Sequence, residues 1–384
     1  MTNKALVIGG GVGGCVAALE LAKLKFDVTI AESASELGGG VRTRLISGHP
    51  FTFGPRHFLT QSSKAFDYLN SIVPLRLCAD HEFWSFVEQD GAFYNYPIHE
   101  DDIPKMPEAP QIYRELQDAE SRLRYQEYRL DKDADVGDIN NYRDFWLKSV
   151  GPTLYDKFIK SYTRKMWMIQ DESQIDDFTW SPKGVAIKSG SRAGWDTAIS
   201  AYPQAPDGYN KLFEKAMNVG KVLFNSDVKV LDPQKNIVEI RGERRTYDVI
   251  VNSSPLDRSF TDTSPGKLKY IGRDIEFVVL PIKYALPPNV YFCYYTGREK
   301  YTRMVEYKKF TRHESDHTLV SLEYPSTNGL YYPFPSLAYQ QIHQLYLEMC
   351  GDRFFNIGRL ALFNYRFDID DAILQALAAK ESLL

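Results

Sequence analysis

The chain has 384 residues, a formal net charge of -4, 43% hydrophobic residues and 14% aromatic residues. The length suggests two or three packed units, and the small acidic balance argues against nucleic acid or an anionic membrane as a partner. No apolar run approaches the roughly 20 residues of a spanning helix. The four cysteines form no C-x-x-C pair, so we expect reduced cysteines and a cytoplasmic location.

The N-terminal residues predict a strand, a helix and a second strand, at residues 4–8, 12–24 and 26–32. A glycine cluster between the first strand and the helix fits G-x-G-x-x-G, and Glu32 ends the second strand. In this context the pattern predicts a dinucleotide-binding turn, with phosphates at the helix N-terminus and Glu32 on a ribose. The glycines of the pattern are Gly9, Gly11 and Gly14.

A second glycine loop follows shortly after IAES (30–33), in ELGGGVRT (36–43). It resembles the G-G-x-x-x-T element of FAD proteins of the glutathione-reductase and amine-oxidase type. The resemblance implies that the dinucleotide is FAD rather than NAD. The expected cofactor-binding residues near the N-terminus are Gly9, Gly11, Val12, Gly13, Gly14, Glu32, Gly38, Gly39, Gly40 and Arg42, and Val228 is added from a later strand.

The middle of the chain changes character several times. HEFWSFVEQDGAFYNYPI predicts a hairpin that turns at Asp90–Gly91. Residues 100–170 are charged and have helical spacing, whereas residues 181–208 are rich in Gly, Ser and Pro and predict a mobile loop. Alternating strands are expected from about 270 to 325, followed by helix, strand and helix.

Four further stretches resemble the UDP-galactopyranose mutase family, in order and over nearly the whole chain. They are FGPRHFLT, then FIKSYTRKMWMIQDES, then KYTRMVEYKKF, and finally LYYPFP with NIGRLALFNYRFDID. The resemblance implies a flavin-dependent mutase that interconverts pyranose and furanose forms of a nucleotide sugar. It implies that N5 of reduced FAD attacks the anomeric carbon, that the nucleoside diphosphate leaves, and that the resulting flavin–sugar adduct opens and recloses.

The same resemblance implies roles for individual residues. Arg303, Tyr332 and Tyr365 match the residues that hold the pyrophosphate of the nucleotide sugar. Phe158, Tyr162, Thr163 and Trp167 match the helix that binds the uridine. Arg359 matches an arginine near the flavin, and Asp368 and Ile369 open the last helix, whose N-terminus would face the flavin and favour its reduced anion.

The departures from the family pattern concentrate around the substrate. Both histidines of the flavin-facing loop are missing, since Arg56 and Leu59 occupy their positions and His57 is displaced by one residue. His99 stands where an asparagine is expected. The arginine of the family's mobile loop has no clear counterpart, and Lys183 and Arg192 are the candidates. Catalytic candidates are therefore Arg303, Arg192, Tyr332, Tyr365, Arg56 and His57.

We expect a Rossmann-type α/β FAD domain, a helical insertion and an antiparallel β-sheet domain, and a homodimer is possible. The sugar stays open among UDP-galactose, UDP-GalNAc, UDP-arabinopyranose and related UDP, GDP or dTDP sugars. An amine-oxidase-like oxidoreductase and a non-catalytic nucleotide-sugar-binding relative are alternatives. HESDH (313–317) fits a zinc motif but follows a strand, so we expect no metal. The expected boundaries are 1–65, 205–260 and 330–384 for the FAD domain, 100–200 for the insertion, and 78–98 with 265–329 for the sheet domain.

Overall fold

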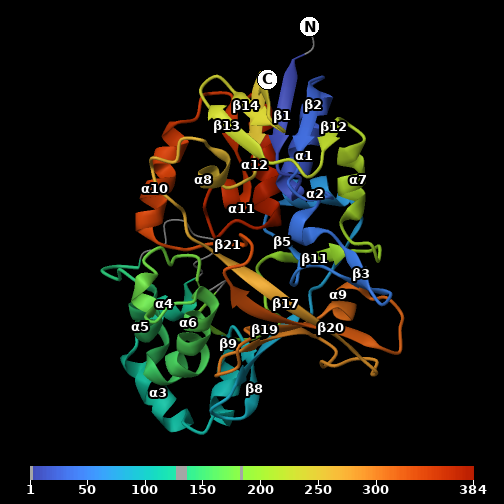
Figure 1. Ribbon diagram of the computed structural model, residues 1–384. Coiled ribbons are helices and arrows are strands. Elements are labelled where there is room, and N and C mark those ends of the chain that lie inside the picture. The colour runs from blue at the N-terminus through green and yellow to red at the C-terminus, as the bar shows by residue number, and fades with distance from the viewer. Residues whose placement is uncertain (1–2, 127–135, 182–184) are drawn as a thin grey trace.

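The computed structural model describes residues 3–126, 136–181 and 185–384. A parallel sheet lies at the end of the molecule that carries both termini (Figure 1), with the strand order β12-β2-β1-β16-β22. Its strands are β1 (Lys4–Ile8), β2 (Asp27–Ala31), β12 (Lys221–Leu223), β16 (Val249–Asn252) and β22 (Phe354–Asn356).

The parallel sheet is buried on both faces because its side chains alternate between two apolar layers. Ala5 and Val7 pack with the layer of helices α1, α7 and α12, whereas Leu6 and Ile8 pack against a small antiparallel sheet and helix α10. This small sheet contains β13 (Val228–Asp232), β14 (Ile237–Ile240) and β15 (Glu243–Thr246). The helices around the parallel sheet are α1 (Val12–Lys23), α2 (Ser63–Ile72), α7 (Asn210–Met217), α8 (Leu256–Ser259), α10 (Leu337–Glu348), α11 (Gly358–Ala361) and α12 (Ile369–Glu381).

A larger sheet forms the second layer, with the order β21-β17-β20-β19-β18-β7-β8. Its neighbouring strands are antiparallel except for β18 and β7, which run parallel. The pairing of β7 with β8 confirms the predicted hairpin. The strands are β7 (Glu82–Val87), β8 (Ala92–Tyr96), β17 (Tyr270–Leu280), β18 (Val290–Tyr295), β19 (Arg303–Glu306), β20 (Thr318–Ser326) and β21 (Tyr332–Pro333).

The helical insertion packs at the end of the molecule far from both termini (Figure 1). Helix α5 is kinked at Gly151, which has φ +80°, just before Pro152. The insertion has its own apolar core around the fully buried Phe145 and Trp146. Its helical segments are α3 (Ala109–Asp118), α4 (Ser121–Tyr125), α5 (Tyr142–Leu154), the π-helical segment Tyr155–Lys160 and α6 (Ser161–Trp167), with short 3-10 turns at Glu100–Lys105 and Glu172–Gln174.

The stretch 181–208, predicted as a loop, contains two short strands in its described part. The strand β10 (Ile187–Lys188) pairs with β9 (Ile98–His99), and β11 (Ile199–Pro203) lies between β5 (Phe58–Thr60) and β6 (Leu75–Leu77). The expectation of a loop was therefore wrong for these residues. Composition indicated a loop, but backbone pairing with strands more than 80 residues away imposes an extended conformation.

Two stretches with strand-like sequence are only partly extended. KVLFNSDVKVL is broken at Asn225, whose φ of +48° ends β12 before β13 begins. YTRMVEYKKF leaves the strand after Glu306 and continues as α9 (Tyr307–Thr311). The fold class itself is confirmed: a Rossmann-type α/β unit, a helical insertion and a mainly antiparallel sheet.

Candidate active site

The first glycine turn joins β1 to α1 and is shaped by two requirements. Gly9 has φ +90°, a conformation that favours glycine, and a Cβ on Gly14 would lie 1.9 Å from the Gly9 carbonyl oxygen. Gly11 precedes the first residue of α1, and no protein atom lies within 4 Å of the place where its Cβ would be. The N-terminus of α1 therefore has open space beside Gly11 and no side-chain cap, as a phosphate-binding helix N-terminus requires.

Neighbouring residues fix this turn in place. The Glu32 carboxylate accepts hydrogen bonds from the Gly10 amide at 2.7 Å and the Ala34 amide at 2.8 Å, so it is held at the edge of the turn. Val12 and Gly13 are buried in the first turn of α1, and a Cβ on Gly13 would lie 3.3 Å from that of Ala372 in α12. Val228 is buried at the start of β13.

The second glycine loop contains the 3-10 turn Gly39–Val41. Gly39 has φ +53° and open space at its Cβ position, whereas a Cβ on Gly40 would lie 3.3 Å from Nη2 of Arg56. Arg42 forms an ion pair with Glu36 at 2.7 Å. Two backbone segments that leave space in front of glycines fit a dinucleotide, which needs close approach by the backbone.

Four arginines gather around the phenol of Tyr332, and we call this set the arginine cluster. They come from four separate parts of the chain: a loop before β5, strand β17, strand β19 and helix α11. The guanidinium carbon of Arg273 lies 4.7 Å from the Tyr332 ring centroid and that of Arg359 lies 5.5 Å from it. The members of the cluster are Arg56, Arg273, Arg303 and Arg359.

Two members of the cluster are neutralised by carboxylates. Arg303 donates to Glu323 from Nε at 3.1 Å and from Nη2 at 2.6 Å, and both side chains are largely buried. Arg359 pairs with Asp368. The other two have no carboxylate partner among the residues that the structure describes: Arg56 donates Nε–H to the Phe53 carbonyl at 2.7 Å, and Arg273 contacts the Gly272 carbonyl and Met166 Sδ.

The excess of positive charge acts on Tyr332. Burial alone raises the pKa of this phenol, but Arg56, Arg303 and Arg273 outweigh burial and lower the pKa to about 8. For Tyr365, whose ring centroid is 5.5 Å from that of Tyr332, burial dominates and the pKa is raised. The two phenols are therefore both protonated at neutral pH, but only Tyr332 can ionise near pH 8.

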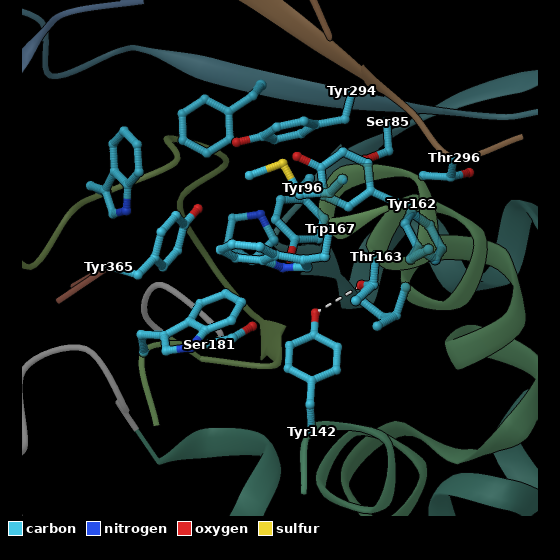
Figure 2. Close-up of a pocket in the computed structure, with 17 residues that line it drawn as sticks. Ser85, Tyr96, Tyr142, Tyr162, Thr163, Trp167, Ser181, Tyr294, Thr296 and Tyr365 are labelled. Atoms are coloured by element: carbon cyan, nitrogen blue, oxygen red, sulfur yellow. Dashed lines mark hydrogen bonds between the residues drawn. The ribbon is translucent and has the colours of Figure 1, made fainter. Parts of the chain in front are cut away.

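An aromatic pocket adjoins the cluster, between the helical insertion and the larger sheet (Figure 2). Figure 2 shows Trp167 in the middle of the pocket, with Tyr294 on the side of the sheet, Tyr162 extending from the helical insertion and Tyr365 on another side. The wall from the insertion includes Phe158, Tyr162, Thr163 and Trp167, which the sequence predicted to lie together.

Burial keeps the tyrosines of the pocket neutral. Thr163 Oγ1 donates to the Tyr142 hydroxyl at 3.2 Å, and burial raises the pKa values of Tyr142, Tyr162 and Tyr294. Such a pocket can take a flat ring without a formal charge. Tyr365 also lines this pocket, with its ring centroid 4.9 Å from that of Trp167, so it connects the pocket to the arginine cluster.

Three other predicted substrate residues are placed differently. Arg192 forms an ion pair with the buried Asp102 at 2.9 Å and donates to the Asn95 side-chain oxygen at 2.8 Å. His99 is buried in β9, with Nε2 3.3 Å from the Gly190 carbonyl oxygen. Lys183 lies outside the described residues. Neither Arg192 nor His99 lines the aromatic pocket.

The flavin-facing loop predicted from FGPRHFLT lies between the second glycine loop and Arg303. A Cβ on Gly54 would lie 3.3 Å from Nη2 of Arg303, which places this loop against the ion pair. The His57 ring stacks on Trp195 with a centroid distance of 4.7 Å. Leu59 is buried in β5. The HESDH stretch is not helical: it follows α9, and its His313 Nε2 is 2.9 Å from His49 Nδ1.

At the start of α12, Asp368 forms a reciprocal capping box with Asp371 and also pairs with Arg359. Ile369 is the first residue of the helix. The helix N-terminus thus lies beside both the arginine cluster and the first turn of α1. The predicted approach of this N-terminus to the flavin, and the roles of Asp368 and Ile369, stay predictions.

The sequence did not indicate Arg273, Trp195 or Tyr294 as site residues. Arg273 is followed by Asp274 and Glu276 in the strand YIGRDIEFVVL but is the one of these three charged residues that is buried, and Trp195 lies in the stretch predicted as a loop. A lone buried-strand arginine was the available signal for Arg273, because a charge in such a strand needs a partner or a ligand. Trp195 and Tyr294 offered no signal beyond their aromatic character.

Comparisons with known proteins agree with this arrangement. A family model described as UDP-galactopyranose mutase matches residues 157–367, and one described as NAD(P)-binding Rossmann-like domain matches residues 7–72. The chain is 23% identical to a probable UDP-galactopyranose mutase of Klebsiella pneumoniae, over 100% of this chain and 96% of the relative. It is 24% identical to a dTDP-fucopyranose mutase of Escherichia coli, over 98% and 97%.

A solved structure of reduced UDP-galactopyranose mutase has the same fold. It superposes with a TM-score of 0.79 at 15% identity and covers 100% of this chain and 94% of that one. Within the described residues, no helix is both long enough and apolar enough to cross a membrane.

Proposed function

The chain belongs to the UDP-galactopyranose mutase family, and we propose that it interconverts the pyranose and furanose forms of a nucleotide sugar, with reduced FAD as cofactor. The observation that carries the proposal is the arginine cluster at the side of a neutral aromatic pocket. A nucleoside diphosphate sugar presents a flat ring, two phosphates and a sugar in that order. The pocket, the cluster and the space beside the glycine loops supply matching chemistry.

The two glycine loops support FAD as the cofactor. Gly11 and Gly39 leave open space for a dinucleotide, and Glu32 lies at the edge of the first turn, where it can accept from a ribose hydroxyl. Reduced flavin, when bound, supplies a nucleophilic ring nitrogen for the anomeric carbon. The protein supplies binding, orientation and a favourable electrostatic environment.

The arginine cluster would hold the diphosphate as its negative charge grows. Arg303 and Arg359 are each paired with their own carboxylate, so the net positive charge comes from Arg56 and Arg273. Guanidinium groups bind phosphate oxygens through short charge-assisted hydrogen bonds. Because the arginines are already in position, little reorganisation is needed as the bond to the sugar breaks.

The two tyrosines would add neutral donors to the same phosphates. At neutral pH the phenols of Tyr332 and Tyr365 carry their protons, so each can donate one hydrogen bond. Their rings also cover the cluster on the side of the aromatic pocket. We infer that the tyrosines exclude water from the phosphates and thereby strengthen the electrostatic contribution of the arginines.

The identity of the sugar is a separate question. Arg56 and Leu59 replace the histidines expected in the flavin-facing loop, so the sugar end of the site differs from the family pattern. UDP-galactose is the first candidate substrate. The similarity to a dTDP-fucopyranose mutase makes a deoxy sugar on dTDP the second.

The test is a panel of nucleotide sugars incubated with FAD-loaded, dithionite-reduced protein and analysed by chromatography. We expect conversion of at least one pyranose to its furanose isomer without net oxidation. Absence of turnover with every nucleotide sugar under reducing conditions would contradict the proposal. Net substrate oxidation by the oxidised protein would instead favour an oxidoreductase of the amine-oxidase type.

A matched pair of variants tests the diphosphate site. Arg303→Gln should lower kcat/KM by about 100- to 1000-fold, the range found when one transition-state donor is removed. Arg298→Gln is the control, because its side chain is 91% exposed and pairs with Glu88 at the protein surface. Equal activities of the two variants would show that Arg303 does not act on the substrate.

A further inference from the structure

Trp195 lines the aromatic pocket and has a hydrogen-bond donor that no described residue accepts. Its indole lines the pocket, and its Nε1 is buried without a hydrogen-bond partner among the residues that the structure describes. Trp180 lines the same pocket, but its Nε1–H donates to the Asp177 carbonyl at 2.6 Å. An indole nitrogen can only donate, so Trp195 lacks an acceptor that Trp180 has.

The backbone around Trp195 is held firmly in place. The Gly194 amide donates to the His81 carbonyl at 2.8 Å, and a Cβ on Gly194 would lie 2.0 Å from the Phe83 ring. On the N-terminal side, Arg192 pairs with Asp102, while Lys188 donates to the Ala193 carbonyl at 2.6 Å. The backbone position of Trp195 is therefore set by the protein before any ligand binds.

Ring contacts place Trp195 at the side of the pocket away from the helical insertion. Its ring centroid is 4.6 Å from that of Phe83 and 4.7 Å from that of His57. The next contacts from Phe83 lead to Tyr294 at 6.3 Å and from there to Tyr162 on α6 at 5.3 Å. Trp195 and α6 thus lie at opposite ends of this row of rings.

His57 connects Trp195 to the cofactor side. It follows Arg56, whose guanidinium lies against the second glycine loop at Gly40. If the nucleobase occupies the wall made by α6, as proposed above, the sugar must extend toward this loop. Trp195 is then beside the sugar rather than beside the base.

We propose that Trp195 is a sugar-binding residue that donates a hydrogen bond from Nε1 to a hydroxyl oxygen of the pyranose and covers one face of the sugar with its indole. The inference rests on the proposed function, since it assumes a nucleotide sugar in this pocket. A sugar suits the site because it combines hydroxyl acceptors with apolar C–H faces, which match an indole that is apolar apart from one N–H. Occupying the donor removes the penalty of a buried, unpaired N–H.

The experiment compares two ligands on the FAD-loaded protein by isothermal titration calorimetry, without turnover. The probes are UDP against UDP-galactose, and dTDP against dTDP-fucose. Trp195→Phe keeps an aromatic ring but removes the donor, so it should weaken the nucleotide sugar about tenfold and leave the nucleoside diphosphate within about twofold. Trp195→His, which keeps a ring N–H, should recover part of the lost affinity.

Trp180→Phe is the matched control in the same pocket. Its indole already has a protein acceptor, so this variant should change the two affinities by equal factors. The inference is overturned if Trp195→Phe changes neither affinity, or lowers both equally. A wild-type protein that binds the nucleoside diphosphates but no nucleotide sugar would overturn both the inference and the proposed function. If the wild type binds both kinds of ligand and Trp195→Phe weakens the nucleotide sugar no more than the nucleoside diphosphate, the inference alone is overturned.

Discussion

The first glycine turn and the arginine cluster are built in opposite ways. The turn uses residues 9–14, which follow one another along the chain, and its geometry is fixed by one strand and one helix. The cluster draws its arginines from positions 56, 273, 303 and 359, on four elements that meet only in the folded chain. The turn can form with local contacts, whereas the cluster needs the whole fold.

The turn and the cluster also differ in the source of their positive potential. The turn attracts anions through backbone amides and needs no charged side chain. The cluster concentrates four cations against two carboxylates within the protein, which is costly unless a ligand or a neighbouring dipole compensates. The proposed diphosphate would compensate the positive charge that the two carboxylates leave.

The largest expected effects come from adding one methyl group at either of two glycines, which separates the stability of the turn from its binding of FAD. Gly14→Ala should destabilise the apoprotein by about 3 kcal/mol, since its Cβ would lie 1.9 Å from the Gly9 carbonyl oxygen. Gly11→Ala should change that stability by less than about 1 kcal/mol, because its Cβ meets no protein atom, yet it should lower FAD content at least tenfold. Urea unfolding measures the stability and flavin absorbance measures the FAD content. A Gly11→Ala protein with full FAD content would contradict the proposed FAD site at the first glycine turn.

A second, smaller effect distinguishes the two kinds of arginine in the cluster. Arg273→Gln should weaken UDP binding to the FAD-loaded protein by about 10- to 100-fold, with little loss of stability, because no carboxylate is left unpaired. Arg303→Gln should also destabilise the protein, by about 3 kcal/mol, since it leaves Glu323 buried without its cation. Calorimetry and urea unfolding of both variants test this, and equal losses of stability would show that Arg273 is not an uncompensated charge.

The smallest expected effect is on the pH dependence of the reaction. The pKa of Tyr332 is lowered to about 8, below the usual value of a phenol, so the group loses its proton as the pH rises through about 8. The resulting phenolate would repel the diphosphate, and kcat/KM should fall up to tenfold per pH unit above that point. Tyr332→Phe should have lower activity without this alkaline decline. An unchanged decline in Tyr332→Phe would assign it to another group.

The sequence predicted the parts of the site that depend on local pattern. Strand, glycines and helix at residues 4–23 were placed correctly because spacing alone specifies them. The aromatic residues of the 158–167 stretch were expected to gather on one wall, and they do line one pocket. Arg303 was identified through its motif. In the structure it lies close enough to Tyr332 for its charge to lower the pKa of the phenol.

The parts that sequence reasoning missed depend on contacts between distant residues. Arg192 was a candidate for the family's mobile-loop arginine, which has no clear counterpart here, but a buried carboxylate 90 residues away binds it. Arg273 was overlooked because its positive charge is available to a ligand only if no carboxylate binds it, and none of the described residues supplies one. Neither property is visible in composition or spacing, since each depends on which side chains the fold brings together.

The pairing of Arg303 with Glu323 has a consequence for release of the product. When the nucleotide departs, the guanidinium keeps its bidentate carboxylate, so the emptied site never exposes a bare buried cation. If the diphosphate binds at Arg303, as proposed, it gains less from binding than it would from an unpaired arginine. We therefore expect Glu323 to shorten the time for which the site holds either isomer.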